Sequence, residues 1–417
     1  MRSDEWVRGA LSAPASFSPD AARALGGPEW LARRRAGAAD ALADLTLPTD
    51  DEEIWRYSRV GALDLGRYRP REVAERSLVV SGPAAAAAQG VVVGDLADPA
   101  VDADLAREHF GVCADESRDA FVTLHDAFAV GGALVFVPKG VVVEEPIFVE
   151  HRSGGDGLAS FPHTLVVAEE GAEVTVVDRF AATGDHLSDA VIELVVGDHA
   201  HVRYVSVQEH GPQTWSVALQ RAHVGRDAAL HSSAIALGGD YARLRSESLL
   251  AGQGGESDML AVYFGDGTQM HDFRTLQDHA APRTRSDLLF KGAVEDTARS
   301  VYSGLIRIRR DAQKSIAYQT NRNLVLTEGA GAESIPNLEI EADDVRCSHA
   351  SAVGPIDDDQ RYYLESRGVR PDDAERLIVL GFFEDVFARL PAPALTPALR
   401  AAVQEKVGHL HGGGRDD

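Results

Sequence analysis

The residues best suited to metal chemistry in this sequence are a cysteine and a histidine near its C-terminal end. The run Asp343-Asp-Val-Arg-Cys347-Ser-His349 places them two residues apart. On a β-strand, where side chains alternate between two faces, both would project from the same face. A thiolate and an imidazole bind iron or zinc far better than magnesium or calcium. The spacing therefore indicates Cys347 and His349 as a pair of candidate soft metal ligands.

The same two residues also have an ordinary structural interpretation, which their spacing leaves open. A buried cysteine packs as a small apolar side chain, and a neighbouring histidine can be satisfied by hydrogen bonds. The chain has only two cysteines, Cys113 and Cys347. It can supply neither a disulfide framework nor the four thiolates of a conventional iron–sulfur or zinc site. A cluster held here needs mixed ligands or residues of a partner.

Other histidines are expected to be structural or solvent-facing. His199 and His201 are two residues apart and would share one strand face, while His271 and His279 flank Phe273 and Arg274. No residue of complementary ligand type is paired with them locally, so they indicate no metal site.

The signatures of several enzyme classes do not occur in this sequence. A phosphate-binding loop of the form G-x-x-x-x-G-K-[ST] is missing, so we expect no ATP hydrolysis by this chain. The short glycine runs at Gly265 and Gly329 lack the context of a dinucleotide site. Neither G-x-S-x-G nor H-E-x-x-H is present. The usual signatures of these enzyme classes are therefore missing.

Charge and hydropathy argue against nucleic-acid and membrane partners. The net charge of −24 would repel phosphate backbones and anionic headgroups. The basic clusters Arg33-Arg34-Arg35 and Arg307, Arg309 and Arg310 are short and predict solvated faces or protein contacts. The first residues show no basic segment followed by an apolar run, and no run of about 18 uncharged apolar residues occurs. We expect a cytoplasmic protein.

The elements that must position these residues fall into three predicted regions. Residues 1–115 are expected to be mainly helical, and residues 116–353 contain short β-branched runs broken by Gly or Asp. Turn-plus-strand units begin at Gly171, Gly197 and Gly225, which are 26 and 28 residues apart. This period favours a parallel β-helix over a sandwich or a propeller, whose blades repeat every ~40 residues or more.

Residues 354–417 are expected to form a helical C-terminal region. One helix is predicted over Asp357–Ser366, a second from Pro371 and a third from Thr396 to about Val407. The apolar stripe predicted for the second helix is Ala374, Leu377, Ile378, Phe382 and Val386. Because an open terminal turn exposes unpaired backbone groups, we expect the two helical regions to cap the β-helix.

Several strings in the chain, taken together, resemble the SufB/SufD family of iron–sulfur cluster assembly proteins. The resemblance spans nearly the whole chain and is densest from about Thr275 to Phe387. The strings are Trp55-Arg-Tyr57, Val137-Pro-Lys-Gly140, Tyr302-Ser-Gly304, Ala317-Tyr-Gln-Thr-Asn-Arg-Asn323, Pro336-Asn-Leu-Glu-Ile340, Cys347-Ser-His349, Tyr363-Leu-Glu-Ser-Arg-Gly368 and Gly381-Phe-Phe383.

The resemblance implies a fold and a set of partners. The family has a right-handed parallel β-helix between helical ends, and in its complexes SufB pairs with SufD while each binds one copy of the ATPase SufC. ATP hydrolysis would then be supplied by SufC, docked on the helices of residues 354–417. A SufB-like partner would pair with the last β-helix strands, roughly Ser315 to His349.

The resemblance also favours the SufD branch and assigns candidate site residues. SufB-like chains tend to carry a sulfur-accepting cysteine where this chain has Asn321, and an amide cannot carry a persulfide. The family histidine that matches His349 lies at the SufB–SufD interface and is implicated in building the nascent cluster. His349 is therefore the expected iron ligand, and Cys347 is a weaker candidate.

The resemblance implies one transient ligand, and it leaves a second ligand and two alternative functions to consider. The transient iron–sulfur cluster would be shared with the SufB-like partner, and whether the complex also contains a flavin is undecided. A SufB-type scaffold is the alternative within the family. A β-helix enzyme acting on polysaccharide is a remote alternative, which would require a secretion signal.

Overall fold

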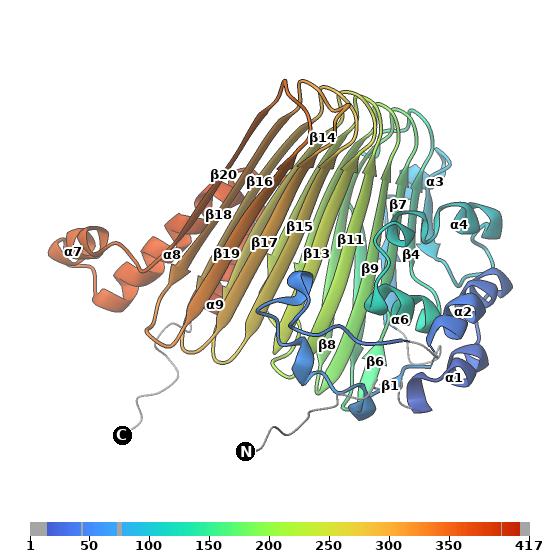
Figure 1. The fold of residues 1–417 in the computed structure, drawn as a ribbon, viewed down its shortest axis with the longest axis horizontal. Helices are drawn as coiled ribbons and strands as arrows, with labels where there is room; N and C mark the ends of the chain where they lie inside the picture. The colour runs from blue at the N-terminus through green and yellow to red at the C-terminus, as the bar shows by residue number, and fades with distance from the viewer. Residues whose placement is uncertain (1–14, 43–44, 73–76, 393, 409–417) are drawn as a thin grey trace, which may run out of the picture.

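The chain forms a parallel β-helix built from two long sheets (Figure 1). The computed structural model describes residues 15–42, 45–72, 77–392 and 394–408. Sheet A has 11 strands, including the short strands β1 (Arg69–Pro70) and β6 (Leu158–Ser160). Its main path consists of β3 (Val92–Asp95), β4 (Ala133–Val137), β7 (His163–Ala168), β9 (His186–Val196), β11 (Trp215–Val224), β13 (Tyr241–Leu250), β15 (Met270–His279), β17 (Arg299–Ile308) and β19 (Gly331–Ile340).

Sheet B runs along the opposite side of the β-helix and has 9 strands. They are β2 (Ser77–Ser81), β5 (Ile147–Gly154), β8 (Glu173–Thr183), β10 (His201–Gln208), β12 (Ala229–Ala236), β14 (Glu256–Gly265), β16 (Arg285–Val294), β18 (Ile316–Val325) and β20 (Arg346–Gly354). Sheet A and sheet B alternate along the chain, so each turn adds one strand to each.

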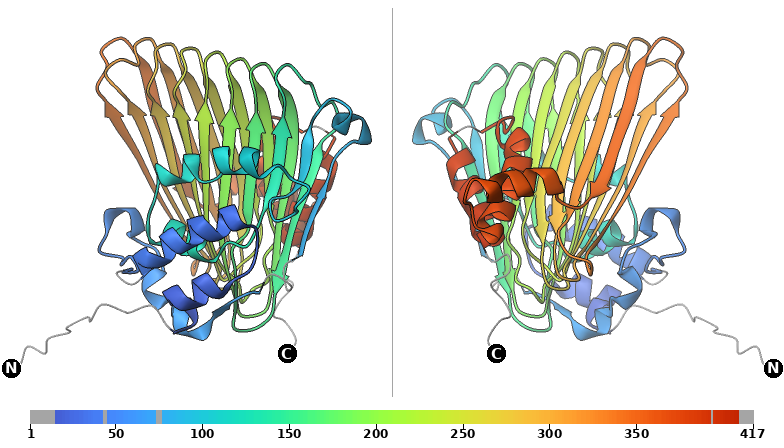
Figure 2. Two further views of the ribbon diagram at one scale, coloured as in Figure 1. Left: turned by 90° about the vertical axis from the view of Figure 1, so that its right-hand side faces the viewer. Right: turned by 90° about the vertical axis from the view of Figure 1, so that its left-hand side faces the viewer.

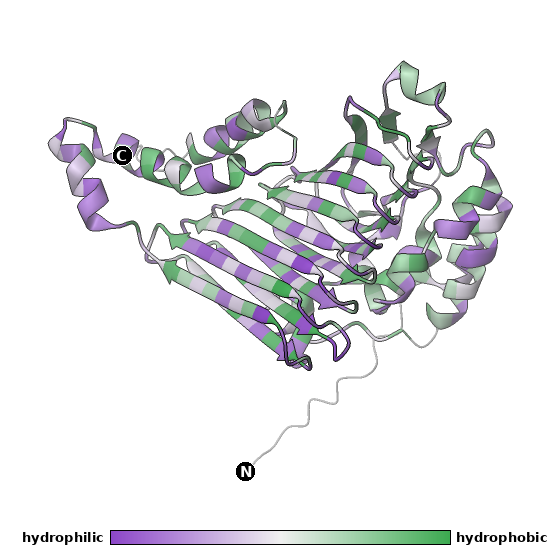
Figure 3. Cartoon of the chain, turned by 90° about the horizontal axis from the view of Figure 1, so that it is seen from above, coloured by the Kyte–Doolittle hydropathy of each residue, from purple (hydrophilic) through white to green (hydrophobic). Residues whose placement is uncertain are grey.

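The pairing register confirms the predicted β-helix. The chain returns to the same position of sheet B after 27 to 31 residues, at Glu173, His201, Ala229, Glu256, Arg285, Ile316 and Arg346. Along each strand, inward and outward residues alternate, and Figure 3 shows the resulting alternation of hydropathy. The early turns enclose an apolar core that includes Val135, Val166 and Val176. The later turns enclose more polar side chains, among them Gln277, Gln319 and Asn321.

Helices cover the outer face of each sheet (Figure 2). On sheet A lie α1 (Pro19–Ala24), α2 (Glu29–Ala41), α4 (Ala103–His109), α5 (Val112–Asp115) and α6 (Ala120–Phe128), with apolar contacts such as Phe121 and Phe128 near Leu187 and Trp215. On sheet B lie α8 (Pro371–Phe387) and α9 (Thr396–Gly408), preceded by α7 (Asp358–Ser366). None of the described helices is both long and apolar enough to span a bilayer.

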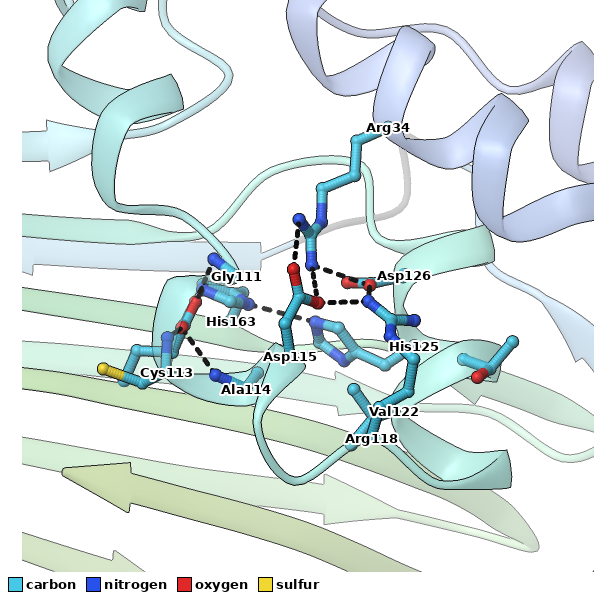
Figure 4. A network of polar contacts seen from close by, with 12 residues as sticks. Arg34, Gly111, Cys113, Ala114, Asp115, Arg118, Val122, His125, Asp126 and His163 are labelled. Carbon is cyan, nitrogen blue, oxygen red and sulfur yellow. Dashed lines mark hydrogen bonds and ion pairs between the residues drawn. The ribbon is translucent and has the colours of Figure 1, made fainter. Parts of the chain in front are cut away.

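A buried polar network fastens α5 and α6 to sheet A (Figure 4). The Glu193 carboxylate accepts hydrogen bonds from the backbone N–H groups of Gly111, Cys113 and Ala114. Nε2 of His163 lies 3.2 Å from Glu193, and Nδ1 of His163 lies 3.1 Å from Nε2 of His125. The three N–H groups satisfy the buried carboxylate of Glu193, which water cannot reach.

The Arg33-Arg34-Arg35 cluster makes contacts within the chain. Arg34 binds Asp115 and Asp126, each at 2.8 Å (Figure 4). Arg35 is buried and donates to backbone carbonyls, including that of Ala129 at 3.0 Å. The cluster therefore joins α2 to the rest of the N-terminal region.

The string Trp55-Arg-Tyr57 lies on sheet A, where two buried arginines hold it. Arg243 stacks on Trp55, with its guanidinium carbon 3.7 Å from the ring centroid, and donates to the carbonyl of Ile54 at 2.7 Å. Arg274 donates to the carbonyl of Arg56 at 2.7 Å. Both arginines are neutralised by Asp272, which is fully buried.

The N-terminal region differs from its predicted mainly helical character. β2 and β3 are strands, and they extend the two sheets by antiparallel pairing with β5 and β4. Conversely, residues 120–128, inside the region predicted to be β-helix, form α6, where Asp119 caps the helix by accepting from the N–H of Val122 at 2.9 Å. The domain boundaries at residues 115 and 353 remain predictions.

The three C-terminal helices form at the predicted positions, but the buried face of α8 is different. Its buried residues are Ala374, Val379, Phe383, Val386 and Phe387. Leu377, which was predicted in the apolar stripe, is 52% exposed. The stripe was misassigned because nearly every turn of this helix offers an apolar residue on more than one side, so its periodicity does not select the face.

The predicted capping is correct for the first turn and wrong for the last. At the first turn, β2, β3 and the segment around α3 (Ala84–Ala87) close the stack, with Ala86 and Val91 in the apolar core. At the other end, α8 and α9 lie on the outer face of sheet B and leave the last turn open (Figure 3). Among the described residues, β19 and β20 each have one strand neighbour, as β2 and β3 do at the first turn, but no described segment comparable to α3 covers their inward side chains.

The buried histidines predict a loss of stability in mild acid. Burial lowers the pKa of His125, His186, His210, His271 and His279 to about 3 or 4. Their unfolded pKa is about 6.5, so between about pH 4 and 6.5 the unfolded chain binds protons that the folded chain does not. This stabilisation is complete above pH 6.5 and is lost as the pH falls.

Two buried carboxyl groups act in the opposite direction. Burial raises the pKa of Asp178 to about 7 and also raises that of Asp189. Because the histidines outnumber them, we expect a lower urea midpoint at pH 5 than at pH 7. An equal or higher midpoint at pH 5 would show that the buried histidines do not dominate the pH dependence of stability.

Candidate functional site

Cys347 and His349 lie on β20, the last strand of sheet B, and share its inward face. They pair in register with Ala317 and Gln319 of β18, which are both buried inside the β-helix. Cys347 is half-buried and packs near the apolar side chains of Ile306 and Ile308. His349 is exposed, because no further turn covers it. The predicted common face of the two side chains is therefore confirmed.

The two side chains differ in their suitability as ligands. Burial raises the pKa of the Cys347 thiol, so little of it is thiolate at neutral pH. The His349 ring is joined by no hydrogen bond to another residue in the described part of the chain. A neutral imidazole nitrogen can bind iron directly. The imidazole of His349 is thus better suited to bind iron than the thiol of Cys347.

Two donors do not make a complete metal site. Among the residues that the structure describes, no group of three or more His, Cys, Asp or Glu side chains is arranged to hold a metal ion. An iron–sulfur cluster at the last turn would need ligands from its own sulfides and from another chain. The open end leaves room for such a chain.

A closed polar cluster lies one turn deeper and involves Asn321. The Asn321 amide donates to the Tyr263 hydroxyl at 3.1 Å, and that hydroxyl donates to Asn323 Oδ1 at 2.6 Å. The Asn323 amide in turn donates to Asn321 Oδ1 at 2.8 Å. All three residues are buried. Sequence reasoning did not predict this cluster, although the alternation of Gln319, Asn321 and Asn323 along one strand face was visible.

The outer edge of β19 carries unpaired backbone groups. The N–H groups of Gly331 and Glu341 donate toward β17, to the carbonyls of Ala298 and Ile308. In a parallel strand alternate residues direct their N–H and C=O groups to opposite sides. The even-numbered residues of β19, including Leu338 and Pro336, therefore direct these groups to the free edge.

The outer edge of β20 also carries unpaired backbone groups. The N–H of Arg346 donates to the Ser315 carbonyl at 3.0 Å, so the backbone groups of Cys347 and His349 face outward. The inward side chains of Leu338, Ile340 and Val353 are also exposed. An open strand edge next to exposed apolar side chains is suited to pairing with another chain.

A second exposed surface lies on α7, which projects from the body of the protein (Figure 1). Tyr362 is 72% exposed and Tyr363 is 57% exposed. We call these two tyrosines the α7 surface. Exposed aromatic side chains of this kind are common in protein interfaces.

The other candidate residues lie away from the open end. His199 and His201 were predicted to share a strand face, and this is wrong: His199 occupies a turn with φ 60°, and β10 begins at His201. His271 is buried and donates from Nε2 to the Phe264 carbonyl at 3.1 Å, and His279 contacts the hydroxyls of Thr284 and Ser286. Both are structural. Cys113 is buried against sheet A, and burial raises its pKa.

Comparison with known proteins gives consistent matches. The family model described as SUF system FeS cluster assembly, SufBD core domain matches residues 151–382, and the model of the SufBD protein N-terminal region matches residues 73–149. An iron-sulfur cluster assembly SufBD family protein of Mycobacterium tuberculosis is 32% identical over 372 residues, which are 87% of this chain and 89% of that protein. The iron-sulfur cluster assembly protein SufD of Bacillus subtilis is 32% identical over 327 residues, 76% of this chain and 74% of that protein.

Proposed function

Since the chain belongs to the SufBD family of iron–sulfur cluster assembly proteins, we propose that it is a SufD-type, non-catalytic subunit of a cytoplasmic Suf complex. It pairs with a SufB-like chain through its last β-helix strands and binds a SufC-like ATPase through its C-terminal helices. Its cargo is a transient iron–sulfur cluster, formed where the two scaffold chains meet.

The SufD assignment is supported by the residue at position 321. Asn321 is buried and its amide takes part in hydrogen bonds with Tyr263 and Asn323. This position offers no thiol that could accept sulfur, which argues against the alternative of a SufB-type scaffold. The similarity to the Bacillus subtilis SufD points in the same direction.

The observation that carries the proposal is the placement of His349. Its ring is exposed on the inward face of a turn that the chain leaves uncovered. A partner that continues the β-helix would enclose this ring together with ligands of its own. His349 then supplies an iron ligand at the interface, and Cys347 has a supporting role.

His349→Ala tests this role in the assembled complex. His349 is exposed, so its loss should change the free energy of unfolding by no more than about 0.5 kcal/mol, and the complex should still form. Iron and acid-labile sulfide recovered after anaerobic purification should fall by roughly 10-fold or more, because a ligand is lost. Cys347→Ser should retain much more. Normal iron and sulfide content in the His349→Ala complex would refute the site.

Pairing with the SufB-like chain is supported by the free edges of β19 and β20. Backbone groups on such edges supply affinity without a long side-chain motif. Pro336 already occupies an even-numbered position of β19, where its missing N–H affects only the free edge. The strand therefore tolerates proline at such a position.

Two proline substitutions separate edge pairing from folding. Leu338→Pro removes an N–H that faces the free edge, so it should weaken binding of the SufB-like chain while the chain itself stays folded. Asn337→Pro removes an N–H directed to β17 and should lower the free energy of unfolding by about 1–3 kcal/mol. Heterodimer affinity and urea unfolding measure the two effects. Unchanged affinity of a folded Leu338→Pro chain would contradict the pairing.

Docking of the ATPase is supported by the α7 surface. α8 and α9 bury their apolar faces against β12, β14 and β16, with Val379, Phe383 and Val403 in that contact. Removing all residues after Gly354 would uncover this core, so truncation is a poor test. The exposed tyrosines of α7 can be changed without disturbing it.

The double substitution Tyr362→Ala and Tyr363→Ala should weaken binding of a SufC-like ATPase by about 2 kcal/mol or more, roughly 30-fold in Kd. Both rings are exposed, so stability should change little. Ile54→Ala, at a position that is 52% exposed on the N-terminal side, is the control. Equal affinities of the double variant and the control, measured by calorimetry, would remove the α7 surface from the docking site.

A further inference from the structure

Gln319 lies directly below His349 in the stack of inward side chains. The two residues pair in register on β18 and β20 and use the same face, so their backbones are separated by one strand spacing of about 4.8 Å. Gln319 is 1% exposed. Neither the oxygen nor the nitrogen of its amide has a hydrogen-bond partner in the described part of the chain.

The groups around Gln319 explain why its amide is unsatisfied. Below it, in register on β16, is the apolar Leu288. On its own strand face, Ala317 has no polar side chain.

On the opposite wall is Gly304, where a Cβ atom would lie 2.7 Å from Gln319 Nε2. The nearest hydroxyl on that wall, that of Tyr302, is engaged with Thr275 at 3.1 Å. The amide of Asn321, the remaining neighbour on the face of β18, is engaged with Tyr263 and Asn323. On the last turn, the hydroxyls of Ser334 and Ser351 are bonded to each other at 2.7 Å, and the polar side chain in register with Gln319 is His349.

We propose that Gln319 is a positioning residue for His349. Its amide hydrogen-bonds to one nitrogen of the neutral ring after a side-chain rotation, and the other nitrogen is then directed to the open end of the β-helix. A neutral imidazole has one donor and one acceptor nitrogen, so this contact selects the tautomer. Hydrogen-bond partners of this kind orient metal-binding histidines. The relevance to cluster assembly rests on the proposed function.

The tautomer of His349 tests the contact in the isolated full-length chain. With histidine rings labelled by nitrogen-15, the His349 signals are assigned by their loss in His349→Ala. The wild-type ring should be held mainly in one neutral tautomer. Gln319→Leu should change the ratio of the two tautomers by about threefold or more, the effect of losing one hydrogen bond.

Gln277→Leu is the matched control. Gln277 is 0% exposed and its amide also has no partner in the described chain, but it pairs in register with Ser248 and Ile306. This substitution should leave the His349 ratio unchanged. A wild-type ratio in Gln319→Leu, or an equal change in Gln277→Leu, overturns the proposal. If Gln319→Leu fails to fold, Gln319→Met, which keeps the side-chain volume, replaces it.

The complex with the partner gives a second readout. Gln319→Leu should lower the recovered iron and sulfide by roughly 10-fold, whereas Gln319→Glu should retain more, because a carboxylate can still accept a hydrogen bond from the ring. If His349→Ala leaves the iron content normal, the proposed function fails, but the tautomer ratio still decides whether Gln319 contacts His349. A changed ratio with normal iron in Gln319→Leu would overturn its positioning role in assembly.

Discussion

A strand inside a parallel sheet forms backbone hydrogen bonds with a neighbour on each side, and in a β-helix only the first and last turns lack one neighbour. This chain treats its two ends differently. At the first turn, β2 and β3 are the outermost strands, and the segment around Ala86 covers the end of the apolar core. At the last turn, β19 and β20 are the outermost strands, and several of their inward side chains are exposed. The exposed side chains of Leu338, Ile340 and His349 follow from that one difference.

The helices pack on the outer faces of the two sheets and not over the last turn. The N-terminal helices bury residues such as Phe121 and Phe128 on sheet A, and α8 and α9 bury Phe383 and Val403 on sheet B. Polar contacts reinforce this arrangement on the N-terminal side, where Glu193 binds the backbone of α5. The described surfaces left for partners include the last turn and α7. The proposed division of the partners follows: a paralogous scaffold chain at the strand edges and the ATPase at the helices.

Sequence patterns were informative wherever local spacing decides the structure. The glycine turns at Gly171, Gly197 and Gly225 gave the repeat of the β-helix, and the capping residues placed α7, α8 and α9. The two-residue spacing of Cys347 and His349 placed them on one face of β20. The patterns failed where long-range packing decides. α6 is short and includes Phe121, Val122 and Thr123, residue types that favour strands, and its helix is buried against sheet A. The buried face of α8, the open last turn and the unsatisfied amide of Gln319 depend on contacts between segments distant in the sequence.

Hydrogen exchange measured by mass spectrometry tests whether the last turn is open in the isolated protein and is covered by a partner chain in the complex. In the isolated protein, peptides covering β19 and β20 should exchange much faster than those covering β13 and β15, which have a strand on each side. Adding a SufB-like chain should slow exchange in β19 and β20 and leave β13 and β15 unchanged. Equal protection of β19 and β13 in the isolated protein would show that the last turn is not open. No change on addition of the SufB-like chain would show that this chain does not pair with β19 and β20.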